Sequence, residues 1–314
     1  MNMKLLHTLV GLSISIVATA QQLPLLSQFQ ESAGVLNPAS LSDLYFVYEH
    51  NLQFRGTHHS QWMDLEGRPQ TSILSGQLLL DDYGPVVPHF GAYFIQDQTG
   101  PTGFTGLYGK FGGIITDDVY ERGVSFAAQV GINQYRLRIS ELELRDAETV
   151  YAADDDGRIA PDAGLGVFAY QRLDNQLVTF GLSVPQVLGL DLSFRGEDGD
   201  IVTQRFRHYY AQAGYLLSLR DDAYLQIAAW LKVVPEVPAH ASAVLRYQTP
   251  SAIYIGVGGT SAKALHGEGG IVIGDRSGAS PVMRIGYGFD YSLASFGPYA
   301  GGTHEVNLSY SLNR

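Results

Sequence analysis

The residues best suited to metal chemistry form two short clusters in this chain of 314 residues. The run Asp154-Asp155-Asp156-Gly157 carries the carboxylates that calcium prefers, but its glycine comes too early for an EF-hand loop and no bidentate glutamate follows. His58-His59 offers two imidazoles, yet no nearby carboxylate or histidine completes a zinc site. We therefore interpret both clusters as loop residues and expect no metal and no cofactor.

The sequence contains no recognisable catalytic arrangement. The pieces Gly256-Val257-Gly258-Gly259 and Gly286-Tyr287-Gly288 do not follow a strand and open a helix, as a phosphate cradle must. They lie within predicted strands, where glycine makes room in a crowded interior or lets a strand bend. A G-x-S-x-G elbow is absent, and no nucleophile, base and orienting group come together. The chain is predicted not to be an enzyme.

The elements that carry these residues are indicated by the alternation of apolar and polar side chains near the C-terminus. Residues 303–312 place Val306 and Leu308 on one face and Glu305 and Asn307 on the other. Because strand side chains point alternately to opposite faces, such ten-residue segments are typical of a transmembrane β-barrel wall, apolar outside and polar inside. Residues 283–292 alternate likewise, with Met283, Ile285, Tyr287, Phe289 and Tyr291 opposite Arg284, Gly286, Gly288, Asp290 and Ser292.

Short alternating runs between turn signals recur along the chain and predict an all-β, antiparallel transmembrane barrel of about 14 strands, with 12 or 16 as neighbouring even counts. The first predicted strand is 44–55, with Phe46 and Phe54 on its apolar face. Thr249-Pro250 and Asp221-Asp222 predict tight periplasmic turns, whereas 141–161 and 187–203 predict long external loops. The strands between the first and the last two are expected at 70–80, 88–97, 104–115, 123–139, 162–172, 176–184, 204–219, 223–233, 239–248, 251–260 and 266–274.

The N-terminus supplies a route to the outer membrane. Lys4 and His7 precede an apolar run that ends in Ala18-Thr19-Ala20, which predicts a secretory signal peptide, residues 1–20, cleaved after Ala20. Residues 21–43 are polar and contain prolines, so we expect a non-strand lead-in before a single barrel domain, residues 44–314. No other apolar run approaches the length of a transmembrane helix. We therefore expect an integral protein of the cell outer membrane, surrounded by its lipid.

The composition agrees with this interpretation. The chain has no cysteine, so it does not rely on disulfides, and its 19 tyrosines and 36 glycines suit aromatic girdles, turns and a crowded interior. A net charge of −11 argues against a nucleic-acid partner, which requires a basic surface.

The order of several short motifs adds a family resemblance. Gln22-Leu23-Pro24-Leu25-Leu26-Ser27-Gln28-Phe29, followed by Leu36-Asn37-Pro38-Ala39, resembles the start of the PorP/SprF family of type IX secretion-associated outer-membrane proteins. Arg207-His208-Tyr209-Tyr210 is similar to the family's middle. The sequence departs from the family where Ser40 follows Asn37-Pro38-Ala39, and where the chain ends without an aromatic residue. The family-motif positions are Pro24, Ser27, Gln28, Asn37, Pro38, His208, Tyr209, Gly286, Tyr287, Asp290, His304 and Glu305.

The resemblance implies a barrel of the Bacteroidota outer membrane that serves protein secretion, gliding motility or surface display. The leading hypothesis is a partner of a large secreted adhesin, or of another type IX substrate, that engages its C-terminal region together with type IX secretion components. One alternative is the family branch that links this machinery to a peptidoglycan-associated lipoprotein. Another is a diffusion channel for small polar solutes, which a polar lumen would permit; a plugged lumen would instead favour docking. The predicted lumen-facing residues are Glu49, Asn51, Gln53, Arg55, Arg284, Asp290 and Glu305.

Overall fold

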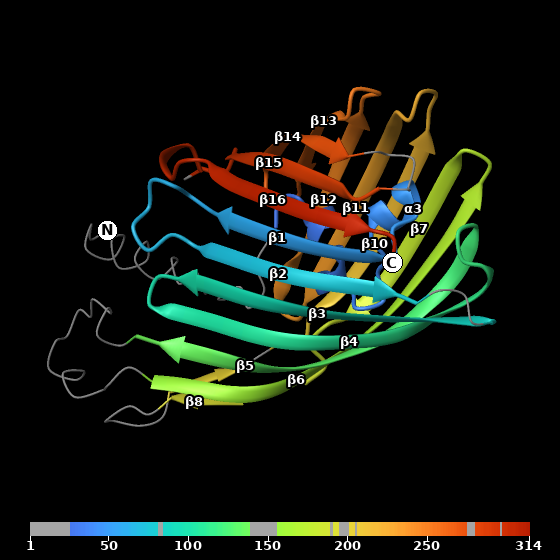
Figure 1. Ribbon diagram of the computed structural model, residues 1–314. Coiled ribbons are helices and arrows are strands. Elements are labelled where there is room, and N and C mark those ends of the chain that lie inside the picture. Colours follow the sequence, from blue (N-terminus) through green and yellow to red (C-terminus); the bar gives the residue numbers. More distant parts are fainter. Residues whose placement is uncertain are drawn as a thin grey trace, which may run out of the picture.

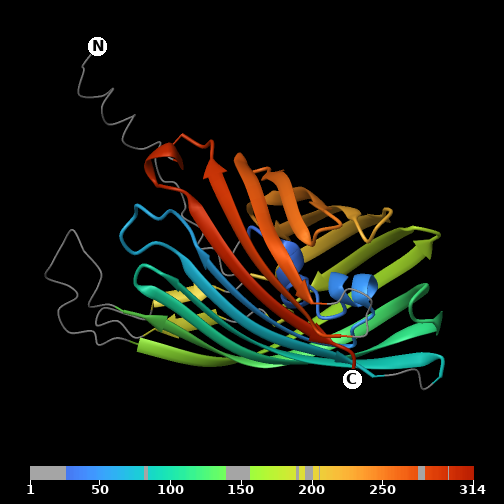
Figure 2. The same ribbon diagram turned by 45° about the horizontal axis from the view of Figure 1, so that its top comes forward.

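The chain folds into one closed antiparallel barrel, seen from two directions in Figures 1 and 2. The computed structural model describes residues 26–80, 84–138, 156–188, 191–194, 201–204, 206–274, 280–295 and 297–314. The order around the wall is β1-β16-β15-β14-β13-β12-β11-β10-β7-β6-β5-β4-β3-β2. Consecutive wall strands therefore pair with each other, and the first pairs with the last. The prediction of an all-β barrel of about fourteen strands is confirmed.

The wall strands have unequal lengths, from 8 residues in β13 to 18 in β6. Two further short strands, β8 (Asp191–Phe194) and β9 (Ile201–Gln204), pair only with each other, within a segment predicted as a long loop. The wall consists of β1 (Leu52–Ser60), β2 (Gln70–Leu79), β3 (Val86–Thr99), β4 (Thr102–Asp118), β5 (Arg122–Leu137), β6 (Asp156–Leu173), β7 (Gln176–Val184), β10 (Tyr209–Ser218), β11 (Tyr224–Val234), β12 (Val237–Gln248), β13 (Ile253–Thr260), β14 (Ala264–Gly274), β15 (Val282–Ser292) and β16 (Thr303–Leu312).

Closure depends on the first and last strands. β1 lies between β16 and β2 in Figure 1, and its register with β16 sets Leu52 opposite Leu312 and Thr57 opposite Asn307. This pairing leaves no free strand edge in the membrane, where unpaired backbone groups would have no water to bind. The first and last strands of the wall are therefore neighbours, as closure of the barrel requires.

The two faces of the wall follow the predicted alternation. Val306 and Leu308 are about half exposed on the outer, lipid-facing surface, whereas Glu305 and Asn307 are buried in the lumen. β15 has the same order, with Ile285 and Phe289 exposed and Arg284 buried.

The connections define the two ends of the barrel. The end at which β1 begins and β16 finishes carries mainly short turns, including those at Asp221-Asp222 and Thr249-Pro250, as predicted. At the opposite end the intervals between consecutive wall strands are longer after β1, β5, β7 and β15, where 61–69, 138–155, 185–208 and 293–302 separate one wall strand from the next in the sequence. Short turns face the periplasm and long loops face outward in such barrels, so we assign these ends as periplasmic and external respectively.

Three predictions about individual elements are wrong. The strand predicted over 44–55 begins only at Leu52, because residues Asp43–Tyr48 form helix α3. His58 and His59 lie in strand β1 rather than in a loop, with His59 buried and His58 exposed. Asp156 and Gly157 belong to strand β6, so the loop predicted over 141–161 ends earlier; Asp154 and Asp155 lie outside the described residues.

The segment before β1 occupies the lumen, and we refer to residues 26–51 as the plug. It contains the 3-10 helix η1 (Phe29–Ser32) and the short helices α2 (Ala33–Leu36) and α3 (Asp43–Tyr48), which Figure 2 shows inside the barrel. Leu26 packs against Ile73, Ile95 and Phe104, close to the external ends of β2, β3 and β4. The plug therefore runs from the external mouth to the periplasmic end. None of the helices in the described ranges is long and apolar enough to cross a membrane.

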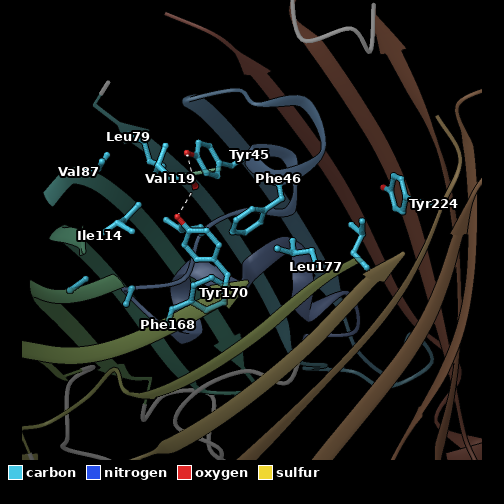
Figure 3. Close-up of a cluster of buried hydrophobic side chains, with 14 residues drawn as sticks. Tyr45, Phe46, Leu79, Val87, Ile114, Val119, Phe168, Tyr170, Leu177 and Tyr224 are labelled. Atoms are coloured by element: carbon cyan, nitrogen blue, oxygen red, sulfur yellow. Dashed lines mark hydrogen bonds between the residues drawn. The ribbon is translucent and has the colours of Figure 1, made fainter. Parts of the chain in front are cut away.

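Helix α3 anchors the periplasmic end of the plug. Ser42 caps it by accepting a hydrogen bond from the Leu44 amide, and the residues that follow are buried on several sides. Phe46 lies 4.9 Å from the ring of Tyr170, and Tyr45 and Tyr170 both donate to the carbonyl of Val119 (Figure 3). This aromatic cluster joins the plug to the β4–β5 turn and to β6.

Candidate functional site

Buried ion pairs fix the middle of the plug to the wall. Arg55, Arg246 and Arg284, one each from β1, β12 and β15, converge on the two plug carboxylates. Glu31 lies 2.5 Å from Arg55, 2.8 Å from Arg246 and 3.2 Å from Arg284. Asp43 lies 2.7 Å from both Arg55 and Arg284. We call Arg55, Arg246 and Arg284 the arginine site.

The plug carboxylates are charged because of these neighbours. Burial alone would raise the pKa of Glu31, but Arg55 and Arg284 outweigh it and hold the pKa below its usual value. The pKa of Asp43 is likewise well below its usual range, because Arg284 and Arg55 overcome the penalty of burial. Removing one partner of such a buried pair leaves an uncompensated charge, which typically costs about 3–5 kcal/mol.

The wall does not neutralise all three arginines itself. Arg246 also binds Glu268 of β14, with Nε 2.7 Å and Nη2 3.2 Å from the two carboxylate oxygens. Arg55 and Arg284, in contrast, contact no carboxylate of the wall among the described residues; both pair only with Glu31 and Asp43. Two guanidinium groups therefore depend on the plug for their counter-charge.

A second contact holds the external end of the plug. Glu305 on β16 accepts the backbone N–H of Ser27 at 2.8 Å and that of Gln28 at 3.1 Å. The Ser27 hydroxyl donates to Asp290 of β15, and the Gln28 side chain reaches the Glu305 carbonyl at 3.4 Å. We call Asp290 and Glu305 the carboxylate clamp. It satisfies backbone donors that would otherwise be buried without partners.

The arginine site and the clamp belong to one network. His266 of β14 hydrogen-bonds Asp290 through Nδ1 at 2.5 Å and Glu268 through Nε2 at 3.2 Å. Because Glu268 binds Arg246, and Arg246 binds Glu31, polar contacts run without a break from Ser27 to the middle of the plug.

Asn37 provides a third point of attachment. Its side chain donates to the carbonyl of Val167 at 3.1 Å and accepts the Ala39 backbone N–H at 3.0 Å. Gly166 and Gly181 make room for it, since a Cβ at Gly166 would overlap the Asn37 amide oxygen and a Cβ at Gly181 would lie 2.7 Å from its nitrogen. These wall glycines therefore form a seat for the plug.

Lys110 of β4 adds an isolated cation. It is buried, and its ammonium group donates to the Gly34 carbonyl of the plug at 3.1 Å. A Cβ on Gly34 or on Gly91 would approach this side chain to 2.7 Å, so both glycines leave space for it. No described carboxylate pairs with Lys110.

The cavities found between the described parts of plug and wall are small. They have volumes of about 80 Å³ beside Gln30 and Gln226, about 30 Å³ beside Lys110, and about 10 Å³ beside Leu26. Because one water molecule needs about 10–15 Å³, the smallest space has room for one water at most and the largest for several. Within the part of the chain that the structure describes, no three histidine or acidic side chains are placed to hold a metal ion.

The structure brings together only some of the family-motif positions. Ser27, Gln28, Asp290 and Glu305 meet at the clamp, and a Cβ on Gly286 would overlap the Tyr254 hydroxyl and lie 3.2 Å from Gln28. Asn37 and Pro38 lie against Gly166. His208 stacks on Tyr210, Tyr209 is exposed, and Tyr287 hydrogen-bonds His304 at 2.6 Å on the outer surface. Pro24 lies outside the described residues.

Sequence reasoning missed several members of the network: Glu31, Asp43, Arg246, Glu268, His266 and Lys110. One signal was present, because Glu31 is the only charged residue between Gln21 and Ser42. A single charge in an otherwise uncharged segment that enters a barrel requires a counter-charge in the wall. Of the predicted lumen-facing residues, Glu49 and Asn51 belong to the plug and precede β1, and Glu49 is exposed.

Comparisons with known proteins agree with this architecture. A family model described as "Type IX secretion system membrane protein PorP/SprF" matches residues 18–310. No curated protein matches the chain. Among solved structures, the Ralstonia pickettii toluene transporter TbuX has a TM-score of 0.55 at 10% identity, covering 90% of this chain and 93% of its own.

Two further solved structures have the same fold. The P. putida toluene transporter TodX gives a TM-score of 0.54 at 11% identity over 90% of this chain and 94% of its own. The translocator domain of the autotransporter NalP from Neisseria meningitidis gives 0.52 at 11% identity over 84% and 88%. Two of these proteins are toluene transporters and the third is an autotransporter domain, and all are only 10–11% identical to this chain, so the likeness concerns the barrel alone.

Fold and lumen together define a protein of the outer membrane, built as a closed β-barrel with a filled lumen. The match over residues 18–310 shows that the chain belongs to the PorP/SprF family of type IX secretion system membrane proteins.

Proposed function

We propose that this protein is a docking partner for a large secreted adhesin, or for another type IX substrate, and that it engages the substrate's C-terminal region at the cell surface. The observation that carries the proposal is the plug, which occupies the lumen and is attached by the arginine site, the carboxylate clamp and Asn37. A diffusion channel requires a water-filled lumen, whereas a docking barrel functions with a filled one.

The external end of the barrel supports the same role. Several long connections lie there, and they include the β8–β9 hairpin. Loops carried by a rigid wall are the usual place for a partner to bind. Family membership implies association with type IX secretion components, and we extend this to one particular class of cargo.

A deletion strain tests the proposal. Loss of the gene should remove one large protein from the cell surface, while other type IX cargo and the uptake of small solutes remain unchanged. The matched control is the same strain complemented with the intact chain. Retention of every large surface protein, together with disturbed anchoring of the periplasmic machinery, would instead favour the lipoprotein-linking branch of the family.

The purified protein provides a second measurement. In planar bilayers it should show little steady conductance, because the plug fills the lumen, and it should bind the C-terminal region of its cargo. Large, stable, ohmic channels with no such binding would identify a solute channel and contradict the docking role.

A further inference from the structure

We propose that the arginine site binds acidic peptide segments, and that the plug is its resident occupant rather than a permanent part of the wall. This inference goes beyond the docking role and does not depend on it, because it concerns the chemistry of the lumen and not the identity of any cargo.

The first step concerns charge. Arg55 and Arg284 have only plug carboxylates as acidic partners among the described residues, and Lys110 has only the Gly34 carbonyl as its hydrogen-bond partner there. If the plug left, three cations from β1, β4 and β15 would line the same part of the lumen without counter-charges. Groups arranged in this way favour a ligand that carries more than one carboxylate.

The second step concerns the kind of ligand. The arginine site contacts peptide backbone as well as carboxylates, because Arg55 Nη1 donates to the Glu31 carbonyl at 3.0 Å while it also binds the Glu31 side chain. Arg55 Nη2 reaches the Ser42 hydroxyl at 2.5 Å. The present occupant is therefore an irregular polypeptide with two acidic side chains, Glu31 and Asp43. A second polypeptide with similarly spaced carboxylates presents the same chemistry.

The third step concerns release. The plug is covalently continuous with the wall only through Asn51 and β1, at the periplasmic end. Its contacts with the wall glycines Gly166 and Gly181, which seat the Asn37 side chain, are non-covalent. Displacement therefore requires exchange of the polar contacts at the arginines and of the apolar contacts of the plug with the wall, such as those of Phe29 and Phe46. A competitor with the sequence of the plug supplies both, and its carboxylates bind the same arginines.

The experiment uses a single cysteine in the otherwise native chain, which has none of its own. Ser32 is buried between plug and wall, so Ser32→Cys should react slowly with a maleimide while the plug is docked. The probe is a peptide with the sequence of residues 26–48, added in excess. It should accelerate labelling about tenfold, whereas the same peptide carrying Glu31→Gln and Asp43→Asn should not.

Two controls separate displacement from general loosening. Ser251→Cys, at an exposed turn, should react quickly with or without either peptide. A short oligoglutamate peptide should also accelerate Ser32→Cys labelling, whereas oligoglutamine should have no effect. Equal effects of the acidic and neutral peptides, or no effect of either, would overturn the proposal.

A second measurement tests the site directly. The full-length protein with Glu31→Gln and Asp43→Asn should bind the fluorescent acidic peptide at least about tenfold more tightly than the neutral one. Adding Arg55→Met should reduce this preference and adding Arg284→Met as well should abolish it, while Glu49→Gln, at an exposed position, should leave it unchanged. If the combined variants do not fold, the labelling of Ser32→Cys in the native background still decides the question.

Discussion

Single glycines determine how closely the plug approaches the wall. Gly166 of β6 faces the lumen under Asn37, and any side chain there would occupy the position of the Asn37 amide. Gly267 of β14 is also a wall glycine, but a Cβ there would meet nothing within 4 Å. Gly166 is therefore required for contact with the plug, whereas Gly267 is a strand glycine at which a larger side chain would find room.

The corresponding prediction compares Gly166→Ala with Gly267→Ala. Gly166→Ala should displace Asn37, remove its hydrogen bond to Val167, and weaken plug docking by about 1–3 kcal/mol, while the barrel itself still assembles. Gly267→Ala should change neither property. Labelling of Ser32→Cys in each background measures docking. The shift in electrophoretic mobility between unheated and heated samples measures assembly of the barrel. Equal labelling in the two variants would show that Asn37 does not hold the plug.

At the scale of elements, the plug is stabilised by charge, and this predicts a pH dependence. Glu31 and Asp43 have a lower pKa in the docked plug than when exposed, so their contribution is complete above the exposed value, which is about 4. This contribution declines progressively as the pH falls below the exposed value, and it is lost completely once the pH has passed the docked values. The plug should therefore stay docked from neutral pH to about pH 4 and be released in stronger acid.

Trp230 reports this release, because its ring lies 5.9 Å from Phe29 of the plug. A Trp62→Phe, His240→Gln background leaves Trp230 as the only tryptophan and removes the imidazole that lies 5.4 Å from its ring. In this background the fluorescence should be constant from about pH 8 to about pH 4. A transition between about pH 5 and pH 7 would show that a group other than Glu31 and Asp43 controls docking.

The elements also show why the wall could be predicted from the sequence and the plug could not. Each wall strand separates lipid from a polar lumen, so alternation is visible in residues such as Leu308 and Asn307. Residues 43–48 are enclosed by the wall and by the rest of the plug, so their apolar side chains do not follow the spacing of a helix with one exposed face. Phe46, Tyr48, Leu52 and Phe54 therefore resemble the apolar face of a single strand. The signal that distinguishes the helix from the strand is Ser42, which caps the helix that begins at Asp43.

The sequence predicts the wall residues of the candidate site but not the plug residues that bind them. Arg284, Asp290 and Glu305 stood out as polar residues on apolar strands, and they do face the lumen. Their partners lie more than two hundred residues away in the chain, as in the pairs Ser27–Asp290 and Asp43–Arg284. Periodicity describes which way a side chain points, but not which segment fills the space that it faces.

At the scale of the whole molecule, the direction of the plug has a consequence for topology. Leu26 and Ser27 lie at the end of the barrel that carries the long connections, whereas Asn51 and Arg314 meet at the opposite end, 2.8 Å apart between side chain and backbone. If the long connections face outward, the chain threads the lumen completely, and its N-terminal side faces the cell exterior.

An epitope inserted between Ala20, the proposed cleavage site, and Leu26 should therefore bind antibody on intact cells. The same epitope placed after Arg314 should bind only after the outer membrane is permeabilised, and this variant is the matched control. The reverse pattern, with both variants assembled, would mean that the assigned ends are exchanged. Exposure of the N-terminal side would give an external partner direct access to the segment that the carboxylate clamp holds.

A partner that pulled on Ser27 and Gln28 from outside would first break their hydrogen bonds to Glu305. The loss of the clamp would then disturb the arginine site, because His266 and Glu268 connect the two, and the arginine site retains the rest of the plug.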